Sequence, residues 1–178
     1  FARRMTLGRL MLPDEAVIEA MDQASADYCQ AAGLVQYELS NFARPGAECR
    51  HNLTYWTNDE YAAAGAGAVS YLGGVRMRRE GNPLRYIEAI ESGSIPYAEC
   101  ERLTRKAAFR ETVVMGLRLI RGVEEDRLTK RFQLSLDEVY GTGLERLVET
   151  GLLVRADGVL ALSRSGRRLA NQVMAELV

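Results

Sequence analysis

The sequence is poor in the residues that most often bind metals or form disulfides. Its 178 residues include one histidine (His51), one tryptophan (Trp56) and three cysteines. A second histidine is absent from these residues, which excludes a two-histidine metal site built from them alone. Cys29, Cys49 and Cys100 lie far apart, so they indicate neither a Cys-x-x-Cys metal motif nor a disulfide-rich fold. Free thiols in a reducing cytoplasm are the plainer interpretation.

Long apolar runs and a strong charge of one sign are also missing. No apolar stretch approaches the roughly 20 residues of a membrane-spanning helix, and no signal peptide is visible. The net charge of −1 argues against general binding to nucleic acid or to anionic membranes. The composition is that of a soluble globular protein, with enough residues for one domain or two small ones. Because the sequence begins with Phe1 instead of methionine, we expect it to be part of a longer protein.

The first half of the sequence predicts a helix, a strand and then a long loop. Residues 13–15 (Pro-Asp-Glu) are typical of a helix start, and apolar residues then recur at helical spacing as far as Gly33. Residues 34–39 predict a strand, and a helix followed by a strand is the repeating unit of a parallel sheet. Arg-Pro-Gly at 44–46 ends regular structure. From there to Tyr61 the sequence predicts a loop with an aromatic cluster.

The middle of the sequence is rich in small residues and turn signals. The Gly/Ala-rich run 62–69 fits either a tightly packed strand or turn, or backbone that approaches a ligand closely. A glycine pair at 73–74 predicts a turn, and 75–79 predict an exposed strand. Residues 83–93 predict a short helix that begins at proline and ends at glycine. Ser-Ile-Pro at 94–96 predicts a linker, so we place a domain boundary there.

The second half predicts a small helical domain with a β-hairpin. Helices are expected over 103–120, over 124–132, and from about 136 or 142 to 150. Two apolar runs then flank Asp157-Gly158, which is a hairpin signal, and Ser163 caps a last helix. This order is typical of a winged-helix module. Such modules often bind DNA through the third helix, but here that helix has more acidic than basic side chains, which phosphate would repel.

His51 is the strongest candidate in the sequence for a ligand-binding side chain. A neutral imidazole can ligate a metal and can hold haem iron axially. Tyr55 follows at four residues, and Trp56 offers a flat apolar face suited to a porphyrin. The alternative is an ordinary packed, hydrogen-bonded histidine. Cys49 is at most a possible soft ligand, and a hydrolase built on Ser40 lacks the glycine-flanked nucleophile turn.

Three motifs carry a resemblance to a known family. They are Tyr-Glu-Leu-Ser-Asn-Phe-Ala-Arg-Pro-Gly at 37–46, His-Asn-x-x-Tyr-Trp at 51–56 and Gly-x-Gly-Ala-x-Ser at 65–70. In this order and spacing the sequence resembles the oxygen-independent coproporphyrinogen III oxidase family of radical S-adenosylmethionine proteins. The second motif is similar to that of the haem-chaperone branch. The resemblance covers nearly the whole sequence.

The resemblance implies an α/β fold in two parts. Residues 1–95 would be the C-terminal portion of a partial TIM-like radical S-adenosylmethionine barrel with its closing loops. Residues 96–178 would be a small helical, winged-helix-like domain. The strand edges exposed by such a partial barrel would favour a homodimer.

The resemblance also implies cofactors and site residues. His51, Asn52, Tyr55 and Trp56 would bind haem, with His51 as the ligand of the haem iron. The Gly65–Val69 segment, with Gly65, Gly67 and Val69 as its matching positions, would lie near S-adenosylmethionine. This sequence departs from the branch at Val69, where histidine is usual. The full-length protein would carry a [4Fe–4S] cluster on a Cys-x-x-x-Cys-x-x-Cys motif, to which the three cysteines here do not correspond.

The function implied is that of a haem chaperone in the cytoplasm, with haem or porphyrin as ligand and a haem-accepting protein as partner. The first alternative is a coproporphyrinogen III oxidase, which decarboxylates its substrate oxidatively to protoporphyrinogen IX. The second alternative is a winged-helix nucleic-acid-binding module. Without the cluster motif, these 178 residues alone are expected to be inactive in radical chemistry.

Overall fold

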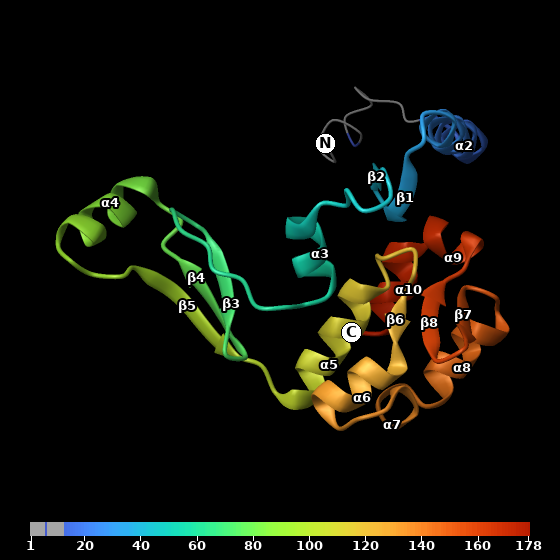
Figure 1. The fold of residues 1–178 in the computed structure, drawn as a ribbon. Coiled ribbons are helices and arrows are strands. Elements are labelled where there is room, and N and C mark those ends of the chain that lie inside the picture. Colours follow the sequence, from blue (N-terminus) through green and yellow to red (C-terminus); the bar gives the residue numbers. More distant parts are fainter. Residues whose placement is uncertain (1–5, 7–12) are drawn as a thin grey trace. The chain divides into compact units, whose positions relative to one another are not determined.

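The computed structural model describes residue 6 and residues 13–178, which divide into two compact units. The described residues up to 36 belong to the first unit together with residues 40–48, and the second comprises residues 37–39 and 49–178. Figure 1 shows the elements along the chain. The fold is α/β, as predicted.

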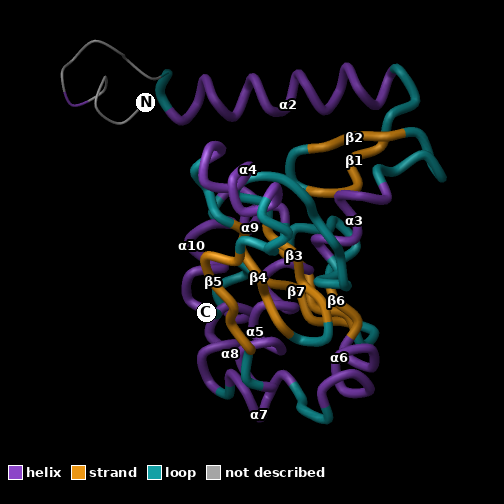
Figure 2. The backbone as a smooth tube through the Cα atoms, turned by 90° about the vertical axis from the view of Figure 1, so that its left-hand side faces the viewer, coloured by secondary structure: helices purple, strands orange, loops and turns teal. Residues whose placement is uncertain are grey.

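The first unit is dominated by helix α2 (Glu15–Ala31), which Figure 2 shows as one continuous helix. Its start and end follow the predicted signals: the Asp14 side chain accepts a hydrogen bond from the backbone N–H of Val17 at 2.8 Å, and Gly33 has φ +74° just past the end. None of the residues of α2 is buried. Met21 is 59% exposed and Tyr28 is 79% exposed.

Strand β1 (Val35–Glu38) confirms the predicted strand and pairs with β2 (Asn41–Ala43) in a two-stranded sheet. The parallel sheet predicted for this part of the chain stays a prediction. Only Leu39 and Ser40 connect the two strands, and a two-residue connection reverses the chain, so that the strands run antiparallel. The chain therefore reverses direction between β1 and β2, in the segment where a loop was expected to begin.

The second unit contains an antiparallel three-stranded sheet in the order β3–β4–β5. Its strands are β3 (Val69–Leu72), β4 (Val75–Arg79) and β5 (Tyr97–Arg102). Helix α4 (Pro83–Glu91) lies between β4 and β5 in the sequence, and Asn82 caps it. The predicted turn at 73–74 and the predicted helix are confirmed. Strand β5 was not predicted.

The predicted domain boundary near residue 95 stays a prediction. In the structure, β5 follows this boundary and pairs with β4, which precedes it. The same sheet thus contains strands from both sides of the predicted linker. The sequence did not predict β5, because this short strand after Pro96 is stabilised by its pairing with β4 and not by a local signal.

The C-terminal residues of the second unit form helices around a second antiparallel sheet, in the order β6–β8–β7. The elements are α5 (Arg105–Gly116), β6 (Val123–Glu124), α6 (Glu125–Phe132), α7 (Leu136–Tyr140), α8 (Thr142–Glu149), β7 (Leu153–Ala156), β8 (Val159–Leu162), α9 (Arg164–Arg168) and α10 (Ala170–Glu176). The predicted hairpin is confirmed, with Asp157 and Gly158 at φ +52° and +74° in its turn.

One helix is shorter than predicted. Helix α5 ends at Gly116 instead of Ile120, because the residues after it pair with β1. Leu39 donates its backbone N–H to Arg118 at 3.0 Å, and Ile120 donates to Tyr37 at 3.1 Å. Of the two starts predicted for the helix that ends near 150, the later one is confirmed by α8, and α7 is a separate helix that ends before Gly141 with φ +50°.

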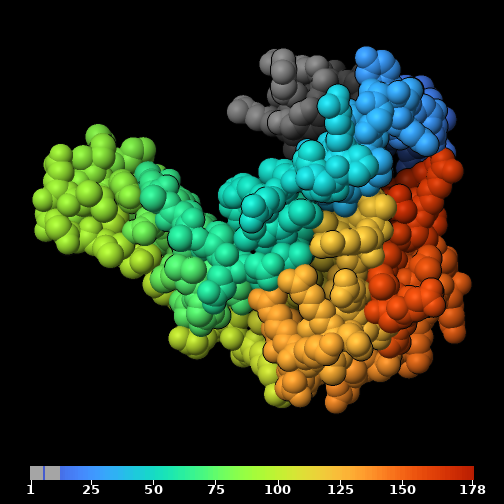
Figure 3. Space-filling view, in the orientation of Figure 1, coloured from blue at the N-terminus to red at the C-terminus, as the bar shows by residue number. Residues whose placement is uncertain are grey.

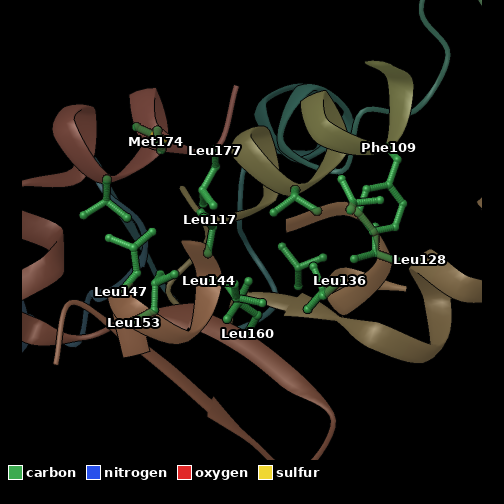
Figure 4. Packing of buried hydrophobic residues seen from close by; sticks show 14 of the residues in the cluster. Phe109, Leu117, Leu128, Leu136, Leu144, Leu147, Leu153, Leu160, Met174 and Leu177 are labelled. Atoms are coloured by element: carbon green, nitrogen blue, oxygen red, sulfur yellow. The ribbon is translucent and has the colours of Figure 1, made fainter. Parts of the chain in front are cut away.

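The hydrophobic core of the second unit lies among these C-terminal helices and the β6–β8–β7 sheet (Figure 4). Phe109 of α5 is fully buried and contacts Phe132 of α6 edge to face, with ring centroids 5.7 Å apart. Leu117 and Leu160 are also fully buried. Burial of each such side chain contributes about 1.5–3 kcal/mol to folding stability. This core therefore fixes the positions of α5 and α6, which flank the candidate site.

Candidate functional site

The His-Asn-x-x-Tyr-Trp motif lies on a helix, α3 (Arg50–Trp56), in the segment that was predicted to be a loop. The prediction missed it because α3 has only seven residues and Cys49, at its N-cap position, makes no side-chain capping bond. The helical spacing places His51 and Tyr55 on one face, because residues four apart are neighbours on a helix. Figure 3 shows atoms of this part of the chain at the surface of the second unit.

His51 begins a row of three aromatic rings. Its imidazole meets Tyr55 edge to face at 4.8 Å between centroids, and Tyr55 meets Tyr61 at 4.6 Å. His51 is exposed, whereas both tyrosines are partly buried. The imidazole is therefore held from one side by an aromatic neighbour and remains open to solvent, and so to a ligand, on the other.

Asn52 connects α3 to β1. Its side-chain amide donates a hydrogen bond to the Tyr37 hydroxyl at 3.2 Å. The backbone carbonyl of Tyr37 in turn accepts from Ile120. This contact joins the second motif to the start of the first, and it fixes the part of α3 that carries His51.

Trp56 has a different environment from the open porphyrin face that the sequence suggested. The guanidinium carbon of Arg118 lies 4.3 Å from the centroid of the indole. Arg118 also lies 3.7 Å from the carboxylate of Glu38, which has no exposed surface. One face of the indole is thus occupied by a cation that a buried carboxylate holds in place.

The far end of the ring row is anchored by charged groups. Arg76 of β4 pairs with Glu111 of α5 at 2.6 Å. Burial raises the pKa of the Tyr61 hydroxyl, although nearby Arg76 acts in the opposite direction. Asn58, which is buried, donates to the Thr112 hydroxyl at 3.0 Å. These bonds join the end of α3 and the β3–β4–β5 sheet to α5.

The glycine segment lies at the edge of this sheet, and its backbone donors are already used within the chain. The N–H of Gly65 donates to the Tyr86 hydroxyl at 3.2 Å, and the N–H of Gly67 donates to the Glu80 carbonyl at 2.8 Å. Both glycines have positive φ, at +112° and +72°. Val69 begins β3 opposite Arg78. A Cβ on Gly65 would meet open space, so both alternatives that the sequence left open, a packed turn and a close approach to a ligand, stay predictions.

Metal chemistry finds little support among the residues that the structure describes. These residues contain no group of three or more His, Cys, Asp or Glu side chains arranged to hold a metal ion. All three cysteines are free thiols, with Cys49 and Cys100 exposed. Within the same residues, no helix combines the length and the apolar character needed to cross a membrane.

The chain is similar in sequence to known proteins over most of its length. Residues 103–169 match the family described as the HemN C-terminal domain. The heme chaperone HemW of Bacillus subtilis is 36% identical over 173 residues, which cover 97% of this chain and 46% of that protein. HemW of Lactococcus lactis is 32% identical over 178 residues, which cover 100% of this chain and 46% of that protein.

The chain is homologous to the HemW proteins. It spans about half the length of these curated relatives. A mouse relative, the mitochondrial radical S-adenosyl methionine domain-containing protein 1, is 30% identical over 185 residues, which cover 96% of this chain and 41% of that protein.

The solved structure of coproporphyrinogen III oxidase (HemN) from Escherichia coli, a radical SAM enzyme, has the same fold. It superposes with a TM-score of 0.73 at 15% identity, covering 93% of this chain and 42% of that chain. The resemblance seen in the three motifs thus agrees with the homology to HemW, and the similarity to HemN shows a shared fold. The roles of the individual site residues stay predictions.

Proposed function

We propose that this chain serves in a haem-chaperone-like radical S-adenosylmethionine protein and that α3 provides its haem ligand. The observation that carries the proposal is the exposed imidazole of His51 at the end of the Tyr55–Tyr61 ring row. The names of the HemW relatives support the same function. Haem and a haem-accepting protein would be the partners.

The residues of α3 fit a haem group. Haem supplies an iron atom that an imidazole nitrogen can ligate, and an exposed histidine meets that requirement. Tyr55 restrains the imidazole from one side, and Asn52 is fixed by Tyr37. Trp56 would support the site through its packing against Arg118.

The described residues do not fit a [4Fe–4S] cluster, since no three cysteines come together among them. We therefore derive no radical step from these residues. Gly65, Gly67 and Val69 are proposed for the vicinity of S-adenosylmethionine in the whole protein. Because the N–H groups of both glycines are occupied, their contribution would be close backbone approach.

We further propose that residues 1–95 complete a barrel and that residues 96–178 are a winged-helix-like domain. The order α5–β6–α6–α7–α8–β7–β8, with β7 and β8 as the wing, supports the second assignment. Binding of DNA is not favoured, because wing residue Arg155 is held by Glu125 and Asp137, each at 2.6 Å. A packing or docking role fits better.

Coproporphyrinogen III oxidase is the alternative function, supported by the structural similarity to HemN. Free thiols, two of them exposed, agree with a reducing compartment such as the cytoplasm. A homodimer stays a proposal as well.

The proposal is tested by titrating the 178-residue chain with haem and following the Soret band. The unmodified chain is expected to shift the band saturably, and His51→Ala to weaken binding at least tenfold because the ligating nitrogen is removed. Cys49→Ser is the matched control, since Cys49 is exposed beside the same helix and should leave binding unchanged. Equal binding by His51→Ala, or loss with Cys49→Ser instead, would contradict the proposal.

A further inference from the structure

We propose that Arg131 of α6 is a positioning residue for His51, because it fixes the backbone that ends α3. The inference rests on the proposed function, in which His51 ligates haem. Arg131 lies within residues 103–169, which match the HemN C-terminal domain, whereas α3 precedes them. This part of the chain would therefore contribute to haem ligation without touching the ligand.

Helix α3 is too short to be stable by itself in water. It has seven residues, and isolated helices shorter than about 12–15 residues are marginal. At its start, Cys49 makes no side-chain capping bond. His51 lies in this uncapped first turn, so the order of its imidazole depends on what holds the other end of α3.

The other end of α3 is closed by its own backbone. Asn58 has φ +49°, and its N–H donates to the Tyr55 carbonyl at 3.0 Å. The N–H of Asp59 donates to the Thr54 carbonyl, also at 3.0 Å. This is the Schellman arrangement, in which a residue with left-handed backbone ends a helix. It does not use the carbonyls of Thr57 and Asn58.

Arg131 binds these two carbonyls. Its guanidinium donates to the Thr57 carbonyl at 3.2 Å and to the Asn58 carbonyl at 2.6 Å. It also lies 3.6 Å from the carboxylate of Asp59, and its side chain is only 30% exposed. A planar guanidinium can donate to several acceptors at once, and a cation is favourable at the C-terminal end of a helix. One side chain of α6 therefore holds three consecutive residues after α3.

Arg127 gives a matched comparison on the same helix. It precedes Arg131 by four residues, so both lie on one face of α6. Arg127 also lies 3.4 Å from the Asp59 carboxylate. Within the part of the chain that the structure describes, its hydrogen bonds go to this carboxylate and not to the backbone after α3. Of the two arginines, Arg131 is therefore the one expected to affect His51.

The first test needs no haem. His51 is the only histidine, so the 178-residue chain gives one set of imidazole signals in a proton NMR spectrum. The imidazole lies edge to face with Tyr55, 4.8 Å between centroids, which predicts a ring-current shift and a nuclear Overhauser effect between the two rings. Arg131→Met keeps the length of the side chain and removes the donors, and it is expected to abolish both. Arg127→Met should leave both unchanged.

The second test titrates the same proteins with haem and follows the Soret band. Arg131→Met is expected to weaken binding about fivefold or more, as the loss of these hydrogen bonds allows. It should also change the Soret maximum of the saturated complex, which a loss of folding stability alone would not do. Arg131→Lys keeps the charge and one donor group, so its affinity and its imidazole signal are expected to lie between those of the other two. Arg127→Met should match the unmodified chain.

The outcomes separate this inference from the proposed function. An unchanged imidazole signal in Arg131→Met, or equal effects of the Arg131 and Arg127 variants, would overturn the inference even if haem binding depends on His51. Haem binding that is insensitive to His51→Ala would contradict the proposed function instead. If circular dichroism shows that Arg131→Met does not fold, Arg131→Lys decides, and an imidazole signal identical to that of the unmodified chain would overturn the inference.

Discussion

The guanidinium of Arg118 lies over the indole of Trp56, 4.3 Å from the ring centroid. Arg118 follows α5, and Trp56 ends α3, so this contact joins two segments that are far apart in the sequence. The buried carboxylate of Glu38 in β1 lies 3.7 Å from the same arginine. The guanidinium of Arg118 therefore links β1, α3 and the segment after α5, all of which flank the candidate site.

Replacing this cation should destabilise the second unit. Arg118→Met removes the charge that faces a carboxylate with no exposed surface, and removing one partner of a buried pair costs about 3 kcal/mol. Urea denaturation followed by Trp56 fluorescence measures the change in the free energy of unfolding. Arg85→Met on exposed α4 is the control, expected within about 0.5 kcal/mol of the unmodified chain. Equal effects would show that the Glu38–Arg118 pair contributes little.

Replacing each of two glycines in the C-terminal helices by alanine should change the free energy of unfolding in opposite directions. Gly166, in the first turn of α9, is buried so closely against the backbone of Leu152 that a Cβ would collide with its carbonyl oxygen. Gly166→Ala should therefore lower the free energy of unfolding by about 3 kcal/mol. Gly143 of α8 has open space around its Cα, so Gly143→Ala should raise it by about 0.5–1 kcal/mol. A stable Gly166→Ala variant would be inconsistent with the observed packing of α9.

Tyr140 should make stability fall at alkaline pH. Burial raises the pKa of its hydroxyl, although nearby Arg110 acts in the opposite direction. In the unfolded chain a tyrosine ionises near pH 10, while the folded chain still holds the proton. The contribution is thus complete below about pH 10 and is lost as the pH rises above it.

The free energy of unfolding is measured at pH 8 and at pH 11 by denaturation followed with circular dichroism, and the two values are subtracted. Tyr140→Phe should lose about 1 kcal/mol less than the unmodified chain over this interval. Tyr28→Phe is the control, because Tyr28 is 79% exposed and should leave the loss unchanged. Identical losses in all three proteins would contradict the assignment to Tyr140.

Local signals in the sequence predicted much of the fold. Helices begin at the predicted starts near Asp14, Pro83 and Ser163, and the turn at Asp157-Gly158 gives the predicted hairpin. The predictions failed where contacts between residues far apart in the sequence determine the secondary structure. Leu119 leaves the expected helix because it pairs with Glu38, and β5 exists through its pairing with β4.

The candidate site was predictable only in its residue types. The motif brought out His51, Asn52, Tyr55 and Trp56, and the spacing of His51 and Tyr55 was already that of neighbours on a helix. No local sequence signal could predict that Arg118 lies on the face of Trp56, since 61 residues lie between them in the sequence. The pairing of Tyr37 with Asn52 likewise results from the fold.

Helix α2 buries none of its 17 residues, and this has a consequence for cooperativity. An isolated helix of this length is only marginally stable in water. Local opening of α2 is therefore expected to cost less free energy than opening of the core around Phe109 and Leu160. Amide hydrogen exchange would accordingly be faster along α2 than at the buried positions of α5.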